Sequence, residues 1–214
     1  YERDHMTDTT LTDPRKTLLD APLSRYQWAA ITVVVLLCAL DGFDVLAITY
    51  AAPGFLKEWG LSHAELGFAL SMGLVGMALG SFLLAPFADI IGRRNMIFVC
   101  LGIMAVGMAA SAWSGSLATL SFWRVITGLG IGAMICIINP LAAEYSNGAR
   151  RDFAVGLMAI GFPIGGTLGG LAAAHLLTLY DWRAIFLLGA AAALLMLPLV
   201  QRWTPEPVAY LIDK

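Results

Sequence analysis

The sequence predicts an all-α membrane protein, folded as a six-transmembrane-helix bundle. Hydrophobic residues make up 59% of the 214 residues and charged residues only 13%, against about 25% charged in an ordinary soluble domain. Helices that are apolar all round are stable in lipid, where each span needs ~20 residues. Six apolar segments meet that length, at 28–51, 65–88, 95–113, 117–143, 153–178 and 183–201.

Each segment follows the previous one after a short connection, which favours a single bundle. The first, 28–51, is interrupted by two acidic residues near its middle. The fourth is longer than a span requires, so it either tilts or extends into water at Glu144. Pro140 and Pro163 remove hydrogen bonds in the fourth and fifth segments and predict kinks there. We therefore divide the chain into an N-terminal segment at 1–26, the bundle at 27–203 and the start of a central loop at 204–214.

Positively charged residues predict the orientation of the bundle, because loops on the cytoplasmic side carry an excess of Lys and Arg. Arg124 lies within the fourth segment, and only Lys57 and Arg183 lie on the side expected to face outward. Both ends of the chain are therefore predicted to be cytoplasmic. The ten positive residues on that side are Arg3, Arg15, Lys16, Arg25, Arg93, Arg94, Arg150, Arg151, Arg202 and Lys214.

Asp41 and Asp44 lie inside the first apolar segment, where a charged side chain costs roughly 2.5–3.5 kcal/mol on insertion scales. Their spacing puts both carboxylates on one helix face. At ~1.5 Å per residue, Arg124 of the fourth segment lies at about the same depth in the bilayer. We predict that the guanidinium pairs with one carboxylate while repulsion and desolvation favour a proton on the other. This arrangement suits a proton carrier.

An ion pair that only locks two helices together is the structural alternative. With two acids and one base, one carboxylate has no positively charged partner, and a static lock does not need that second carboxylate. A membrane aspartyl protease is excluded, because its two acids must face each other from separate helices. No nucleophile, cofactor site or nucleotide site is predicted, so an enzyme is not expected. Cys38, Cys100 and Cys136 lack metal-ligand spacing and are expected to be small core residues, and the net charge of −2 does not indicate nucleic-acid binding.

A charged cluster follows the second segment and ends the fourth. Asp89 is expected at a helix C-terminus, where a negative charge opposes the helix dipole. We therefore expect a partner for it, such as Arg93 or the N-terminus of another helix. The cluster comprises Asp89, Gly92, Arg93, Arg94 and Glu144.

Glycines recur at four-residue spacing within the apolar segments. Small residues at this spacing allow helix backbones to approach closely, so packing is favoured over ligand contact. A shift of 89 residues aligns several of them and also aligns Arg94 with Arg183, which indicates either a three-plus-three repeat or chance agreement. The expected packing glycines are Gly76, Gly80, Gly128, Gly132, Gly165 and Gly169.

Several of these motifs together resemble the major facilitator superfamily, and within it the aromatic acid:proton symporter family. Asp41-Gly42-Phe43-Asp44 is similar to that family's first-helix motif. The segments from Ala85 to Arg94, from Arg124 to Gly130 and from Thr204 to Leu211 are similar to motifs of the superfamily. Ala85 and Ile90 depart from the loop motif, which usually has glycine and arginine there, so this chain has one positive charge fewer in that loop.

The resemblance implies the N-terminal half of a fold with three-plus-three inverted repeats and twelve helices. It implies proton-coupled import of small aromatic carboxylates, such as benzoate-like or hydroxybenzoate-like acids, across the inner membrane. Asp41 and Asp44 would couple protons, Arg124 would pair with them or with the substrate, and the charged cluster from Asp89 to Glu144 would form the inner gate. The partners implied are the lipid bilayer, protons, the aromatic acid and a missing C-terminal six-helix half, toward which the two carboxylates are expected to face.

Two alternatives stay open on the sequence. In the first, the chain belongs to a carrier for another solute, such as a sugar, an organic anion or a drug. In the second, the chain is a truncated membrane remnant that does not transport.

Overall fold

The computed structural model describes residues 23–204, and the elements begin with α2. Within this range six helices are long and apolar enough to cross a membrane, which confirms the predicted fold class. The charged residues expected near both ends of the chain, such as Arg3 and Lys214, lie outside the described residues. The elements are α2 (Arg25–Trp59), α3 (His63–Leu83), α4 (Phe87–Ile91), α5 (Arg93–Ala112), α6 (Leu117–Tyr145), a 3₁₀ turn (Gly148–Arg150), α7 (Arg151–Leu179) and α8 (Arg183–Trp203).

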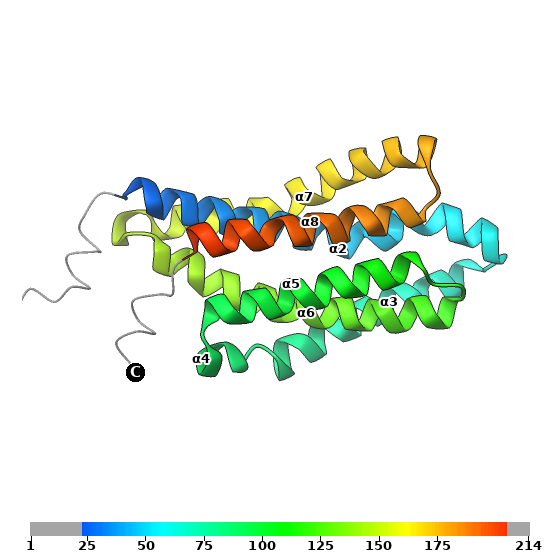
Figure 1. Cartoon of the computed structure of the whole chain (residues 1–214), viewed down its shortest axis with the longest axis horizontal. Helices are drawn as coiled ribbons and strands as arrows, with labels where there is room; N and C mark the ends of the chain where they lie inside the picture. The colour runs from blue at the N-terminus through cyan, green and yellow to red at the C-terminus, as the bar shows by residue number, and fades with distance from the viewer. Residues whose placement is uncertain (1–22, 205–214) are drawn as a thin grey trace, which may run out of the picture.

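The six long helices run back and forth along the long axis of the molecule (Figure 1). The start of α2 and the end of α8 lie at the same end, together with α4, and we call this the terminal end. The turns that follow α2, α5 and α7 lie at the opposite end, which we call the far end. The ends of the described bundle therefore emerge on one side.

Three of these helices have a serine at the N-cap position. The hydroxyls of Ser24, Ser62 and Ser116 accept backbone hydrogen bonds at the starts of α2, α3 and α6. These bonds satisfy N–H groups that have no partner within the helix. At the end of α2, Gly60 has a φ of 64°, a left-handed conformation that glycine adopts without strain.

The predicted segment 65–88 is wrong in one respect, because it is not a single helix. The structure ends α3 at Leu83 and starts the separate five-residue helix α4 at Phe87. Pro86 lies between the two and lacks the N–H group that a continuous helix requires. The hydrophobic run continues through the break, so hydropathy alone does not reveal it.

Two close helix pairs carry most of the packing, α3 with α6 and α2 with α7. Helix α5 packs against α6 and α8 and closes the space between the pairs. Among the membrane-spanning helices, α3 and α7 bury the smallest share of their surfaces. The core therefore lies among α2, α5, α6 and α8.

Glycines lie where the paired helices come closest. A Cβ added at Gly76 of α3 would overlap the carbonyl oxygen of Val125 on α6. A Cβ added at Gly165 of α7 would overlap the carbonyl oxygen of Ala39 on α2. The shift of 89 residues aligns Gly76 with Gly165. Gly80, Gly128, Gly132 and Gly169 likewise lie against the facing helix.

On the partner helices α2 and α6 the corresponding shift is 86 residues, which takes Gly42 to Gly128. Gly42 of α2 lies against the carbonyl oxygen of Phe162 on α7, and Gly128 of α6 lies against that of Gly73 on α3. The shift of 89 residues takes Gly73 to Phe162. The α3 and α6 pair thus repeats the packing pattern of the α2 and α7 pair, with α3 related to α7 by a shift of 89 residues and α2 related to α6 by a shift of 86, as expected for three-plus-three repeats.

Substituting Ala for Gly76 should destabilise the bundle, whereas substituting Ala for Gly67 should not. Alanine normally stabilises a helix interior by about 0.5–1 kcal/mol relative to glycine. At Gly76 the new methyl group meets main-chain atoms of α6, so we expect a net loss of about 1–3 kcal/mol. At Gly67 nothing lies within 4 Å of the added Cβ. Thermal unfolding in detergent measures both, and equal effects at the two positions would contradict the packing role.

Candidate functional site

Asp41 and Asp44 of α2 are both 0% exposed. Neither carboxylate has a hydrogen-bond partner for either of its oxygens among the described residues. The expectation that they face a second half is therefore wrong, because this bundle already encloses them. The physical reason is that α6, α7 and α8 pack against α2.

Arg124 enters the same region from α6 and is 3% exposed. Its Nη2 donates to the hydroxyls of Ser111 at 3.1 Å and Thr127 at 3.2 Å, and to the sulfur of Met108 at 2.9 Å. The ring of Phe186 on α8 lies 4.9 Å from Cζ, within the range of a cation–π interaction. The groups that accept hydrogen bonds from the guanidinium are thus all neutral.

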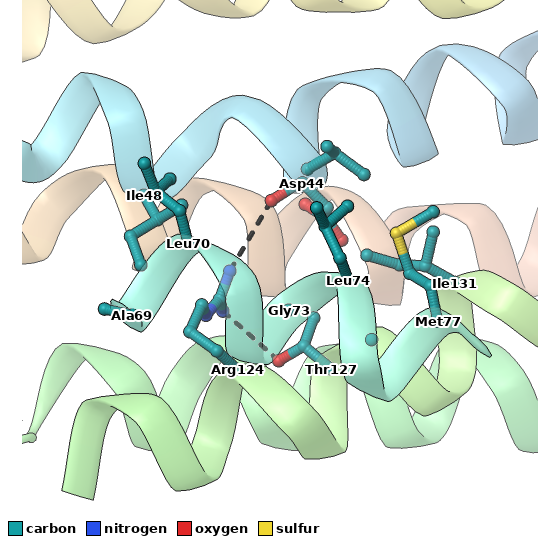
Figure 2. Close-up of a pocket in the computed structure, with 12 residues that line it drawn as sticks. Asp44, Ile48, Ala69, Leu70, Gly73, Leu74, Met77, Arg124, Thr127 and Ile131 are labelled. Atoms are coloured by element: carbon teal, nitrogen blue, oxygen red, sulfur yellow. Dashed lines mark hydrogen bonds between the residues drawn. The ribbon is translucent and has the colours of Figure 1, made fainter. Parts of the chain in front are cut away.

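The predicted depth match of Arg124 with the acidic pair agrees with the structure, but the predicted ion pair is wrong. Nη1 of Arg124 donates to the main-chain carbonyl oxygen of Asp44 at 3.5 Å, as Figure 2 shows. No carboxylate oxygen lies within 4.0 Å of the guanidinium in the described part of the chain. The Asp44 side chain instead extends toward α8, where a Cβ added at Gly189 would lie 2.8 Å from Oδ1.

A pocket between α2, α3 and α6 opens beside this arginine (Figure 2). Asp44, Arg124 and Thr127 line it, but Asp41 does not. The two acids therefore differ, although the sequence places them on one helix face. The other lining residues are mostly apolar: Val45, Ile48, Ala69, Leu70, Gly73, Leu74, Met77, Gly128 and Ile131.

The charged cluster lies at the terminal end. Arg93 at the start of α5 forms an ion pair with Glu144 near the end of α6. Nη2 of Arg94 donates to the carbonyl oxygen of Gln201 on α8 at 2.7 Å. Gly92 between α4 and α5 has a φ of 96°, which side chains disfavour. These contacts tie α5 to both of its neighbours.

The expected Asp89–Arg93 pair is not formed. Asp89 is exposed and lies in the first turn of α4, not at a helix C-terminus. Its charge therefore does not oppose the helix dipole, and the stated reason for a partner disappears. Among the described residues no ion pair involves Asp89, although it lines a second pocket with Arg93, Cys136 and Pro140. Cys136 is exposed, unlike the buried Cys38 and Cys100, so the expectation of a core position is wrong for it.

The comparison with protein families decides the classification. The model of the Major Facilitator Superfamily matches residues 34–212, a range that includes both the buried acids and Arg124. The chain belongs to the major facilitator superfamily. It is accordingly a multi-pass membrane protein of a transporter family, and the resemblance in its motifs is confirmed.

Several curated relatives of this major facilitator chain are named for aromatic acids. The 4-hydroxybenzoate transporter PcaK of Acinetobacter baylyi is 33% identical over 212 residues, which are 99% of this chain and 46% of that protein. The gallate transporter of Pseudomonas putida is 32% identical over 190 residues, or 89% of this chain and 42% of that protein. The chain spans about half the length of the curated relatives it matches.

Solved structures of the superfamily share the fold. The xylose transporter XylE from E. coli, in a partially occluded inward open conformation, has a TM-score of 0.80 at 20% identity. The match covers 88% of this chain and 52% of that chain. At this level of identity the likeness supports the fold alone.

The major facilitator bundle also has an ion pair at the far end that we did not predict. Arg183 at the start of α8 contacts Glu58 of α2 at 2.7 Å, and the indole N–H of Trp182 donates to the same carboxylate at 2.7 Å. This pair mirrors Arg93–Glu144 at the terminal end. No direct signal was present in the sequence, because the shift of 89 residues aligns Arg183 with Arg94, which donates to Gln201 and does not pair with Glu144.

The hydroxyls around Arg124 were missed as well. Ser111 and Thr127 are uncharged polar residues in apolar helices, and nothing in the sequence relates Ser111 to Arg124. Only the packing of α5 against α6 brings them together. Spacing within one helix finds Thr127, three residues from Arg124, but not Ser111.

Proposed function

We propose that this chain forms the N-terminal six-helix half of a proton-coupled importer of small aromatic carboxylates in the inner membrane. The observation that carries the proposal is the environment of Arg124: a buried cation beside an apolar pocket, with only neutral acceptors in contact. The names of the curated relatives support the substrate class, and the family supports transport.

A buried guanidinium without an anionic contact is costly, and a ligand carboxylate offsets that cost. Arginine offers five N–H donors in a planar fork that matches a carboxylate. In this chain Nη2 is already used, Nη1 has one long contact of 3.5 Å, and Nε has no partner among the described residues. The remaining donors are those that would bind the substrate.

The lining of the pocket beside Arg124 has the chemistry that suits an aromatic ring, because aliphatic side chains from three helices form it, but the pocket has to widen to admit a ring. Binding sites of small molecules are typically apolar with a few polar groups that orient the ligand. Here the polar groups are Asp44, Arg124 and Thr127. A benzoate-like acid would direct its carboxylate toward the arginine and its ring toward Ile48, Leu70 and Leu74.

Asp41 and Asp44 would carry the coupled proton. A carboxyl group without hydrogen-bond donors in a low-dielectric interior costs less when it is protonated and neutral. Loss of that proton next to Arg124 would leave an anion that competes with the substrate for the guanidinium. Substrate and proton binding would then favour each other, as symport requires.

The charged cluster at the terminal end would form the inner gate, on the cytoplasmic side that the positive residues indicate. The Arg93–Glu144 pair joins α5 to α6, and Asp89 and Arg93 face the same pocket. A second six-helix half would complete the substrate pathway, in line with the greater length of the curated relatives.

An uptake assay with radiolabelled 4-hydroxybenzoate tests the proposal in cells that express the native gene product. We expect saturable uptake that a protonophore abolishes and that excess benzoate inhibits. Benzyl alcohol, which keeps the ring but lacks the carboxylate, should not compete. Uptake insensitive to benzoate but inhibited by xylose would reject the aromatic acid and favour another solute.

A further inference from the structure

Arg124 is held by two hydroxyl groups from different helices. Ser111 belongs to α5 and Thr127 to α6, and the two side chains are 0% and 1% exposed. Both accept from the same nitrogen, Nη2, at 3.1 and 3.2 Å. That nitrogen has only two hydrogens, and the two hydroxyls and the sulfur of Met108 together accept both of them.

Each hydroxyl has already used its only hydrogen. The Ser111 hydroxyl donates to the carbonyl oxygen of Gly107 at 2.7 Å, and that of Thr127 donates to the carbonyl oxygen of Trp123 at 2.9 Å. A hydroxyl has one hydrogen and two acceptor lone pairs. Both side chains are thus oriented as acceptors toward Arg124 and have no donor left for an anion.

The contact between the two helices also depends on Gly107 of α5. A Cβ added there would overlap the hydroxyl oxygen of Thr127. The absence of a side chain at Gly107 lets that hydroxyl lie against α5, close to Ser111. The ring of Phe186 then contacts the guanidinium from α8.

We propose that Ser111 and Thr127 are positioning residues that orient the Arg124 guanidinium for a carboxylate ligand. By holding Nη2, they direct Nη1 and Nε, the donors without a close acceptor, away from α5. The inference rests on the proposed role of Arg124 in binding the aromatic acid. It goes beyond that role by naming the groups that preorganise the arginine.

Uptake kinetics test the inference in the native gene product. Ser111→Ala and Thr127→Val should each raise the KM for 4-hydroxybenzoate about 5- to 10-fold, with the maximal rate nearly unchanged. Thr127→Ser keeps the hydroxyl and should restore the KM of the unmodified protein. Unchanged KM in a variant that lacks both hydroxyls would overturn the inference.

Matched controls separate positioning from the general effect of removing a hydroxyl from a helix. The Ser71 hydroxyl donates to the carbonyl oxygen of Gly67 at 2.7 Å, and the Thr32 hydroxyl donates to the carbonyl oxygen of Trp28 at 2.8 Å. These bonds resemble those of Ser111 and Thr127, but neither residue contacts Arg124. Ser71→Ala and Thr32→Val should leave KM unchanged, and a rise equal to that in the test variants would reject positioning.

A second measurement does not depend on transport. In purified protein with ¹⁵N-labelled arginine, a held guanidinium rotates slowly and gives separate Nη signals, which Arg124→Lys assigns. The variant lacking both hydroxyls should merge these signals. Unchanged signals would overturn the positioning role, whereas merged signals in a protein without aromatic acid uptake would reject the proposed function and keep the positioning role.

Discussion

Replacing Asp41 or Asp44 by Asn should abolish proton-driven uptake of the aromatic acid while the protein still inserts and folds. Asparagine keeps the shape of the side chain but cannot exchange a proton. Insertion should improve, because a charge at the bilayer centre costs roughly 2.5–3.5 kcal/mol. Thermal stability should not fall, since neither carboxylate has a hydrogen bond to lose among the described residues.

The two variants should differ in one measurement. Asp44 lines the pocket beside Arg124 and Asp41 does not. Asp44→Asn should therefore change the KM for substrate exchange, whereas Asp41→Asn should leave exchange intact and remove only accumulation. Exchange of labelled for unlabelled 4-hydroxybenzoate in vesicles without a proton gradient measures this difference.

Asp152→Asn is the matched control, because this acid is exposed in the first turn of α7. It should leave both uptake and exchange unchanged. Normal proton-driven accumulation in both Asp41→Asn and Asp44→Asn would reject a coupling role for the pair. Loss of folded protein in either variant would instead favour the structural lock.

Arg124→Gln should weaken binding of the aromatic acid about 100-fold, or by ~3 kcal/mol, because it removes the buried cation that meets the carboxylate. Arg124→Lys should recover only part of the loss. Lysine keeps the charge but lacks the planar fork and cannot keep both hydroxyl contacts in the same geometry. Inhibition of uptake by benzoate, measured across a concentration series, gives the change in affinity.

Arg183→Gln provides the control for this variant. Arg183 also forms hydrogen bonds to a neighbouring side chain, Glu58, but in a partly exposed pair at the far end. Such pairs contribute about 0–1 kcal/mol, so affinity for benzoate should stay within about threefold of the unmodified protein. Equal losses at Arg124 and Arg183 would show that Arg124 acts on the fold and not on the ligand.

The number and order of the membrane helices followed from composition and hydropathy, but the length of α2 did not, because this helix continues to Trp59, past the predicted end at residue 51. Lipid imposes one requirement on each segment, which is enough apolar residues to span ~30 Å with all backbone groups hydrogen-bonded within the helix. That requirement is local, so a window of sequence is sufficient to test it. The break at Pro86 is an exception, because Phe87 to Ile91 continue the hydrophobic run but form a separate helix.

The acidic pair and Arg124 were recognisable for the same reason, since a charge in an apolar segment is conspicuous without any structure. Their shared depth followed from counting residues along a helix. Side-chain direction did not follow, because it depends on which helices surround α2. The expected ion pair therefore proved to be a contact with the Asp44 main chain, and Asp41 proved to lie apart from the pocket.

Local sequence was thus enough to establish a six-helix membrane bundle with three buried charges at one depth. Tertiary structure decided which atoms meet: Ser111 with Arg124 from neighbouring helices, Arg93 with Glu144 in place of Asp89, and Gly76 with Val125. The physical reason is that the two kinds of interaction depend on different parts of the chain. Transfer into lipid acts on each segment separately, whereas a hydrogen bond or a close glycine contact requires two helices to be placed within a few ångströms and at one rotation about their axes.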